Sequence, residues 1–153
     1  MDALLLGRQT YDNFAGHWPA APADIPFTGL LNGVDKYVAS RTLSDPLDWS
    51  GSTVLTDPVP DAVAALKRRY DEIHVIGSLN LVHTLLRSRL VDRLELWVYP
   101  ILLGTGKRVF VDGTPPTTLT LTESAAHTNG VLQLTYLTAA PSESSTETPE
   151  PTR

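Results

Sequence analysis

The sequence predicts an α/β domain with an open, mostly parallel β-sheet, flanking helices and a C-terminal antiparallel hairpin. Three observations support this fold class. Short apolar runs alternate with segments of helical period, small residues follow several of the runs, and two late segments alternate with a period of two. Strands buried on both faces of a parallel sheet are continuously apolar, whereas half-buried antiparallel strands alternate apolar and polar residues.

The apolar runs give the predicted strands in chain order. The first covers residues 3–6 and ends at Gly7, a residue that permits a tight turn. Further strands are expected over 36–39, 53–55, 73–76, 94–99 and 109–111. The last two strands are expected at 119–121 and 132–136, where leucines and a tyrosine alternate with polar residues. Thr128-Asn129-Gly130 between them predicts a hairpin turn.

Apolar spacing predicts helices between these strands. The first helix is expected over 10–16, with Tyr11, Phe14 and the following Trp18 on one side. The residues expected to share a face in the later helices are Val63, Leu66 and Tyr70 after Asp61, and Leu79, Val82, Leu86 and Leu90 in 79–90, with Leu85 beside them. Several prolines interrupt residues 20–33, which predicts a loop with a short helical turn.

Composition restricts the class of protein. The 153 residues predict one domain, with the folded part over 1–138 and a disordered tail over 139–153, where the chain is polar. There is no cysteine, and 17 acidic residues outnumber 12 basic ones. The basic cluster 67–69 reads as a solvated helix face, so nucleic acid is not an expected partner. No apolar run approaches the roughly 20 residues of a membrane span, and the expected location is the cytoplasm.

Small and basic residues follow the predicted strands, where open α/β sheets bind ligands. Gly7-Arg8, Ser40-Arg41 and Gly77-Ser78 each follow a strand, and Gly77-Ser78 also precedes a helix. A helix N-terminus attracts anions, and an arginine can grip a phosphate with its planar fork. Each motif alone is explained as well by a tight turn or a surface arginine. Together they predict an NADP-type dinucleotide, with Arg41 or Arg8 at its 2′-phosphate.

Longer motifs then carry a family resemblance. LLLGRQTYDNF, KYVASRTL, IHVIGSLNLVHTLL and LVDRLELWVYPILLGTGKRVF occur in this order before the closing hairpin. In this order they resemble the reductase domain of bacterial riboflavin biosynthesis, the RibD C-terminal domain, and its dihydrofolate-reductase-like relatives. The resemblance extends from Ala3 to Tyr136.

The resemblance implies NADPH-dependent reduction of a small-molecule substrate, and a homodimer. It assigns Gly7, Arg8 and Thr10 to the cofactor phosphates, Ser40 and Arg41 to the 2′-phosphate, and Gly77, Ser78, Leu79 and Leu81 to the diphosphate and nearby ribose. It assigns Tyr11, Phe14 and Trp18 to one side of the substrate pocket, and Leu103 and Gly104, within the loop 102–106, to the other. Core packing is the competing explanation for the three aromatic residues.

The chain departs from the family at its start. Family members begin with a strand and a Ser-x-Asp-Gly-like loop that this sequence lacks before Asp2, and that strand is central, between those corresponding to 73–76 and 94–99. Three explanations are open: a longer natural chain, direct pairing of the two flanking strands, or a strand donated by a partner chain.

The function expected from these features is an NADPH-dependent reductase of a small heterocyclic or carbonyl substrate. The alternative is a non-catalytic dinucleotide-binding or dimerisation domain. No metal-ligand motif is present, and the catalytic residues stay unassigned. The polar candidates for a proton donor are His17, Asp12 and Asp24, of which His17 is preferred.

Overall fold

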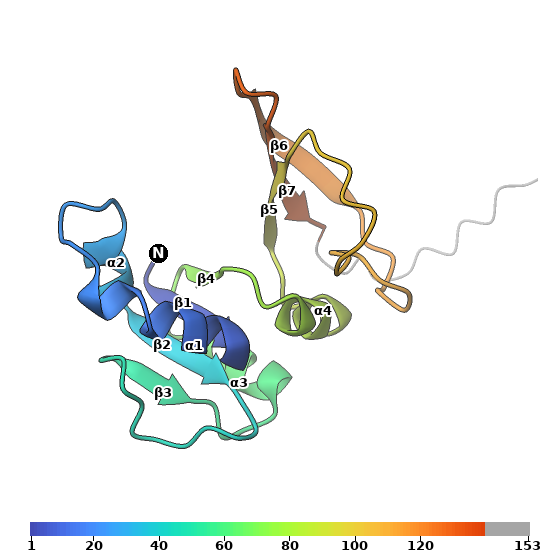
Figure 1. Cartoon of the computed structure of the whole chain (residues 1–153). Coiled ribbons are helices and arrows are strands. Elements are labelled where there is room, and N and C mark those ends of the chain that lie inside the picture. The colour runs from blue at the N-terminus through green and yellow to red at the C-terminus, as the bar shows by residue number, and fades with distance from the viewer. Residues whose placement is uncertain (140–153) are drawn as a thin grey trace, which may run out of the picture. The chain divides into compact units, whose positions relative to one another are not determined.

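A computed structural model describes residues 1–139, and Figure 1 traces its elements. The chain forms two compact units. Of the described residues, the first unit contains Met1–Leu90 and Gly106–Thr114, and the second contains Val91–Thr105 and residues 115–139. The predicted tail over 139–153 lies, apart from Ala139, outside the described residues.

The first unit is built on a four-stranded parallel sheet in the order β3-β2-β1-β4. Its strands are β1 (Ala3–Gly7), β2 (Asp35–Ala39), β3 (Ser52–Val54) and β4 (Ile73–Val75). Its helices are α1 (Arg8–Ala15), the 3₁₀ helix η1 (Trp18–Ala20), α2 (Thr28–Gly33), α3 (Val59–Leu66) and α4 (Leu79–Arg87). The α/β class and the parallel sheet are therefore confirmed.

The core of the first unit forms around β1, whose residues 3–6 are fully buried. This is the burial that a continuously apolar strand predicts. Leu4 and Leu6 share one face of the sheet and pack with Tyr11, Val38 and Trp49. Helix α1 contacts both β1 and β2 and covers this core (Figure 1).

Helix α4 buries a face that only partly matches the predicted one. Its buried residues are Leu81, Leu85 and Leu86; Leu86 belongs to the predicted stripe, whereas Leu79 and Val82 are only half-buried. The helix also ends at Arg87, before Leu90. Leu81 was missed because Leu81 and Leu85, four residues apart, form an equally regular apolar row in the sequence.

The side chain of Lys36 is fully buried in β2. Its Nζ donates hydrogen bonds to the carbonyl oxygens of Asn32 at 3.1 Å, Val34 at 2.8 Å and Ser50 at 3.0 Å. The ammonium also lies 4.6 Å from the centre of the Trp49 ring. Burial lowers the pKa of Lys36 below its ordinary value. An ammonium has three donors, so these carbonyls satisfy all of them.

A second polar cluster also lies at the amino-terminal end of the parallel strands. The Tyr70 hydroxyl donates to a carboxylate oxygen of Asp35 and lies 2.8 Å from the Tyr37 hydroxyl. Arg69 donates to the Tyr37 hydroxyl at 3.1 Å and pairs with Asp35 at 3.6 Å. Partial burial and the Asp35 carboxylate raise the pKa of Tyr70. The cluster joins the start of β2 to the segment that leads into β4.

The second unit is a three-stranded antiparallel sheet in the order β5-β7-β6. Its strands are β5 (Arg93–Val98), β6 (Leu119–Ala126) and β7 (Leu132–Thr138). Between β6 and β7, the His127 N–H bonds to the Val131 carbonyl at 2.9 Å, and Gly130 has a positive φ of 84°. The predicted hairpin and its turn are therefore confirmed.

Three expectations about strands are corrected. The strand predicted at 94–99 forms as β5, but it belongs to an antiparallel sheet and not to the parallel one. It pairs with β7, and the alternating leucines of the two strands face one another. The strand predicted at 109–111 does not form, since Gly106 and Gly113 turn the backbone at positive φ on either side. Among residues 1–139, the observed ladder of β4 is with β1 and that of β5 is with β7, so the suggested direct pairing of these two strands is not among the ladders of either sheet.

Candidate functional site

The predicted motifs meet at the carboxyl-terminal edge of the parallel sheet. Because β1 pairs with β2 on one side and β4 on the other, the ends of these three strands are adjacent. Gly7 ends β1 opposite Ala39 of β2, Ser40 follows directly, and Gly77-Ser78 follow β4. This edge is where ligands bind in open α/β sheets.

Two hydroxyl groups lie together at the ends of β1 and β4. The backbone N–H of Gly7 donates to Ser78 Oγ at 2.8 Å, and Ser78 Oγ lies 2.6 Å from Thr10 Oγ1. Each hydroxyl has one proton, and only one of the two protons is used between them. Whichever hydroxyl donates to the other, the second keeps a proton for an outside acceptor. The pair therefore offers one hydroxyl donor at this edge.

Gly7 is required here for space. A Cβ at this position would lie 2.7 Å from Ser78 Oγ and 3.0 Å from Ser78 Cβ. The φ of Gly7 is −80°, which any residue adopts, so its backbone conformation does not demand glycine. Gly77 and Ser78 differ in this respect, since both have positive φ, 70° and 59°. Together these features bring the β4–α4 turn close against the end of β1.

The N-termini of α1 and α4 both begin at this edge. Gly7 and Ser78 are the residues preceding these helices, and neither makes a side-chain capping hydrogen bond. The hydroxyl of Ser78 turns instead toward Gly7 and Thr10. The first N–H groups of a helix have no acceptor within the helix. Two uncapped helix starts therefore present backbone donors and positive dipole ends, which suit an anion.

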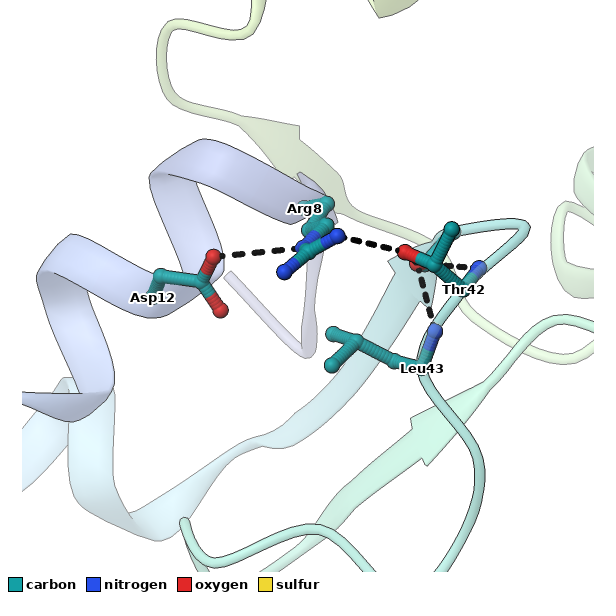
Figure 2. Close-up of polar contacts among 5 residues, drawn as sticks. Arg8, Asp12, Thr42 and Leu43 are labelled. Carbon is teal, nitrogen blue, oxygen red and sulfur yellow. Dashed lines mark hydrogen bonds and ion pairs between the residues drawn. The ribbon is translucent and has the colours of Figure 1, made fainter.

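The turn after β2 is organised by two hydroxyl side chains (Figure 2). Ser40 Oγ accepts hydrogen bonds from the N–H groups of Thr42 at 3.2 Å and Leu43 at 3.0 Å. Arg8 Nη1 donates to Thr42 Oγ1 at 2.6 Å, and Arg8 Nε lies 3.4 Å from a carboxylate oxygen of Asp12. Sequence reasoning missed Thr42, although a threonine two residues after a serine at a strand end is a recognisable turn signal.

Arg41 differs from Arg8 in its contacts. It is exposed, and in the described part of the chain its guanidinium has no hydrogen bond or ion pair. Arg8 also reaches solvent, with about half of its side chain exposed (53%), but it is held by Thr42 and Asp12. Of the two arginines predicted for the 2′-phosphate, Arg41 is the one whose donors are all available.

The two predicted leucines of the α4 turn are placed differently. Leu79 is half-buried at the first position of α4. The side chain of Leu81 is buried and belongs to the helix face that packs inward. Any contribution of Leu81 to ligand binding therefore comes from its backbone in the first turn of the helix.

The aromatic residues predicted for the substrate pocket pack together around Trp49. Tyr11 is buried, and its hydroxyl accepts a hydrogen bond from the Trp49 backbone N–H at 3.2 Å. Phe14 is half-buried and meets the rings of Trp18 and Trp49 edge to face, with centres 6.2 and 6.5 Å apart. This is the core packing that competed with a pocket role. Leu103 and Gly104 are exposed in the second unit.

The candidate proton donors have few contacts in the structure. His17 is exposed, and its ring meets that of Trp18 edge to face, with centres 5.1 Å apart. Asp12 is engaged with Arg8, and Asp24 is exposed. Over residues 1–139, no group of three His, Asp or Glu side chains is placed to hold a metal ion, and no helix is long and apolar enough to span a membrane.

Comparison with known proteins gives consistent matches. The family model described as the RibD C-terminal domain matches residues 1–133. The Bacillus subtilis protein YyaP, itself described as uncharacterized, is 27% identical over 140 residues, covering 89% of this chain and 73% of YyaP.

Two solved structures share the fold. A putative riboflavin biosynthesis protein from Shewanella sp. PV-4 aligns with a TM-score of 0.73 at 22% identity, over 91% of this chain and 75% of that chain. A pyrimidine reductase-like protein from Corynebacterium diphtheriae aligns with a TM-score of 0.64 at 19% identity, over 91% and 76% of the respective chains.

Proposed function

This chain belongs to the RibD C-terminal domain family, and from that premise we propose that it is an NADPH-dependent reductase. The substrate class we propose is a small heterocyclic or carbonyl compound. The observation that carries the proposal is the set of available donors at one sheet edge, including the unpartnered guanidinium of Arg41 and the hydroxyl pair of Thr10 and Ser78. A ligand with several phosphates would use all of them.

The residues at this edge fit the phosphates of NADPH. Thr10, Ser78 and the first N–H groups of α1 and α4 would hold the diphosphate, because they present a hydroxyl donor and two uncapped helix starts. A Cβ added at Gly77 would meet only Thr10 Oγ1, at 3.9 Å, so a ligand could approach this backbone closely. When bound, NADPH supplies the hydride, and the protein binds and orients it.

Arg41 is the residue that we propose binds the 2′-phosphate. Its charge is uncompensated, and it follows Ser40 directly at the end of β2. A guanidinium binds phosphate through paired, charge-assisted hydrogen bonds. NADH lacks the 2′-phosphate, so Arg41 should favour NADPH over NADH.

The test is a titration of the full chain with NADPH and NADH, followed by intrinsic fluorescence and by thermal shift. We expect tighter binding of NADPH, and loss of about tenfold in that preference on Arg41→Ala, equivalent to roughly 1.4 kcal/mol. Arg87→Ala is the matched control, because Arg87 is also exposed but lies in the last turn of α4, away from Ser78. An unchanged preference in Arg41→Ala would refute the role of Arg41.

The reductase part of the proposal is tested separately. NADPH oxidation is followed at its absorbance with a panel of carbonyl and aminopyrimidine substrates. Turnover with any member supports a reductase. Binding of NADPH without turnover across the panel would favour the alternative of a dinucleotide-binding domain without catalysis, and binding of neither nucleotide would overturn the proposal.

A further inference from the structure

We propose that Arg8 is a positioning residue, which holds the turn 40–43 in place so that Arg41 is presented to the ligand. In this account Arg8 does not contact the phosphate itself. The inference rests on the proposed function, because it explains how the NADPH-reading side chain is positioned. Arg41 binds the phosphate and Arg8 positions the turn, and these two roles follow from the contacts that each arginine makes.

Arg8 links the ends of two neighbouring strands. Arg8 opens α1 directly after β1, and Thr42 lies in the turn after β2, 34 positions later in the chain. Their hydrogen bond, 2.6 Å from Nη1 to Oγ1, is the shorter of the two contacts of Arg8 (Figure 2). A hydrogen bond from a charged donor is stronger than one between neutral groups. Arg8 therefore ties this turn to the start of α1.

The backbone around Arg41 is held on both sides. Ser40 Oγ accepts from the N–H groups of Thr42 and Leu43, which closes the turn on itself. Thr42 is in addition fixed through its side chain by Arg8. Arg41 lies between Ser40 and Thr42, so both of its neighbours are held while its own side chain stays available. A pre-positioned side chain loses less freedom when it binds, which improves affinity.

The two arginines differ in whether a carboxylate offsets their charge. Asp12 lies one helical turn after Arg8 and partly offsets its charge, at 3.4 Å from Nε. A phosphate approaching Arg8 would also approach this carboxylate. No carboxylate is paired with Arg41 in residues 1–139. The attraction for an anion is thus concentrated on Arg41, and Arg8 contributes through geometry.

The experiment compares Thr42→Val with Thr42→Ser in the full chain. Valine keeps the branched shape but removes the acceptor for Arg8, whereas serine keeps the hydroxyl. We expect Thr42→Val to weaken NADPH binding by about fivefold to tenfold while changing NADH binding by less than about twofold. Thr42→Ser should bind NADPH like the parent chain. In an Arg41→Ala background, Thr42→Val should cause no further loss, because the side chain it positions is gone.

Arg8→Lys provides an independent variant should Thr42→Val fold poorly. Lysine keeps the charge but lacks the planar fork, so we expect the same selective loss of NADPH binding. If Arg8 contacts the phosphate itself, Thr42→Val would release it and leave NADPH binding unchanged or tighter, and the proposal would fail. Equal losses for NADPH and NADH would also overturn it, since they indicate general damage to the site.

These outcomes separate the two proposals. A parent chain that binds neither nucleotide contradicts the proposed function and this inference with it. A parent chain that prefers NADPH, together with a Thr42→Val variant that binds it equally well, leaves the function standing and refutes the positioning role alone. Thermal melting of each variant shows whether its fold is kept.

Discussion

The two ends of the parallel sheet differ in how their polar groups are satisfied. At the amino-terminal end, Lys36 donates to three carbonyl oxygens, and Asp35, Tyr37, Arg69 and Tyr70 bond to one another. At the carboxyl-terminal end, one arginine, one hydroxyl proton and two uncapped helix starts have no acceptor among the contacts described above.

This difference separates polar groups that stabilise the fold from groups placed for a ligand. Donors that bond to no protein acceptor add no intramolecular hydrogen bond to the fold, and they stay available to a ligand. The comparison predicts that substitutions at the amino-terminal end change the free energy of unfolding. Substitutions of the open groups should change ligand binding instead.

The largest effect is expected for Lys36→Met. Methionine has an unbranched side chain of similar length, but it lacks the ammonium that donates to three carbonyl oxygens. Leaving such groups unsatisfied should reduce the free energy of unfolding by about 3 kcal/mol. Urea unfolding measures the change, with Lys107→Met, at an exposed lysine, as the control. A loss of less than about 1 kcal/mol would contradict the view that this end is held together by Lys36.

A smaller effect is expected for Tyr70→Phe, which removes the hydroxyl bonded to Asp35 and Tyr37. The loss should be about 1 kcal/mol near neutral pH. Because the folded protein raises the pKa of Tyr70, the stabilisation is complete below the unfolded pKa of about 10 and is lost as pH rises toward the folded value. Urea unfolding between pH 7 and 11 should show the two proteins converging at high pH. A constant difference across this range would contradict the assigned role of the hydroxyl.

The smallest effect on stability is expected for Arg41→Ala. An exposed side chain with no hydrogen bond or ion pair should change the free energy of unfolding by less than about 0.5 kcal/mol. The same variant is expected to lose its preference for NADPH. The two measurements together therefore distinguish groups that stabilise the fold from groups that bind the ligand. A stability loss above about 1 kcal/mol would show that Arg41 supports the fold and would weaken the comparison.

The sequence predicted the features that depend on local pattern. The apolar run of β1, the glycine and serine after the strands and the Asn129-Gly130 turn were all visible as short motifs. Features that depend on distant partners were not visible. Lys36 was predicted only as the first residue of a strand, because nothing local shows that three carbonyl groups will surround its ammonium. The pairing of β5 was likewise not visible, because its partner β7 lies more than thirty residues later in the chain.

The candidate site was predicted to a similar depth. The strand-end motifs were placed correctly at one edge, since parallel strands bring their carboxyl ends together. The contact between Arg8 and Thr42 was missed, because two guanidinium groups of equal chemistry differ only in what the folded chain places beside them. The aromatic residues of α1 shared one helix face as predicted, and that face packs around Trp49.

The close approach of Gly7 to Ser78 has a consequence for how this sequence can change over generations. The two positions are 71 residues apart, yet a side chain added at the first would strike the hydroxyl of the second. Alanine at position 7 therefore requires the side chain at position 78 to move or to become smaller. The order of substitutions matters, and an alignment of descendants should show the two positions changing together.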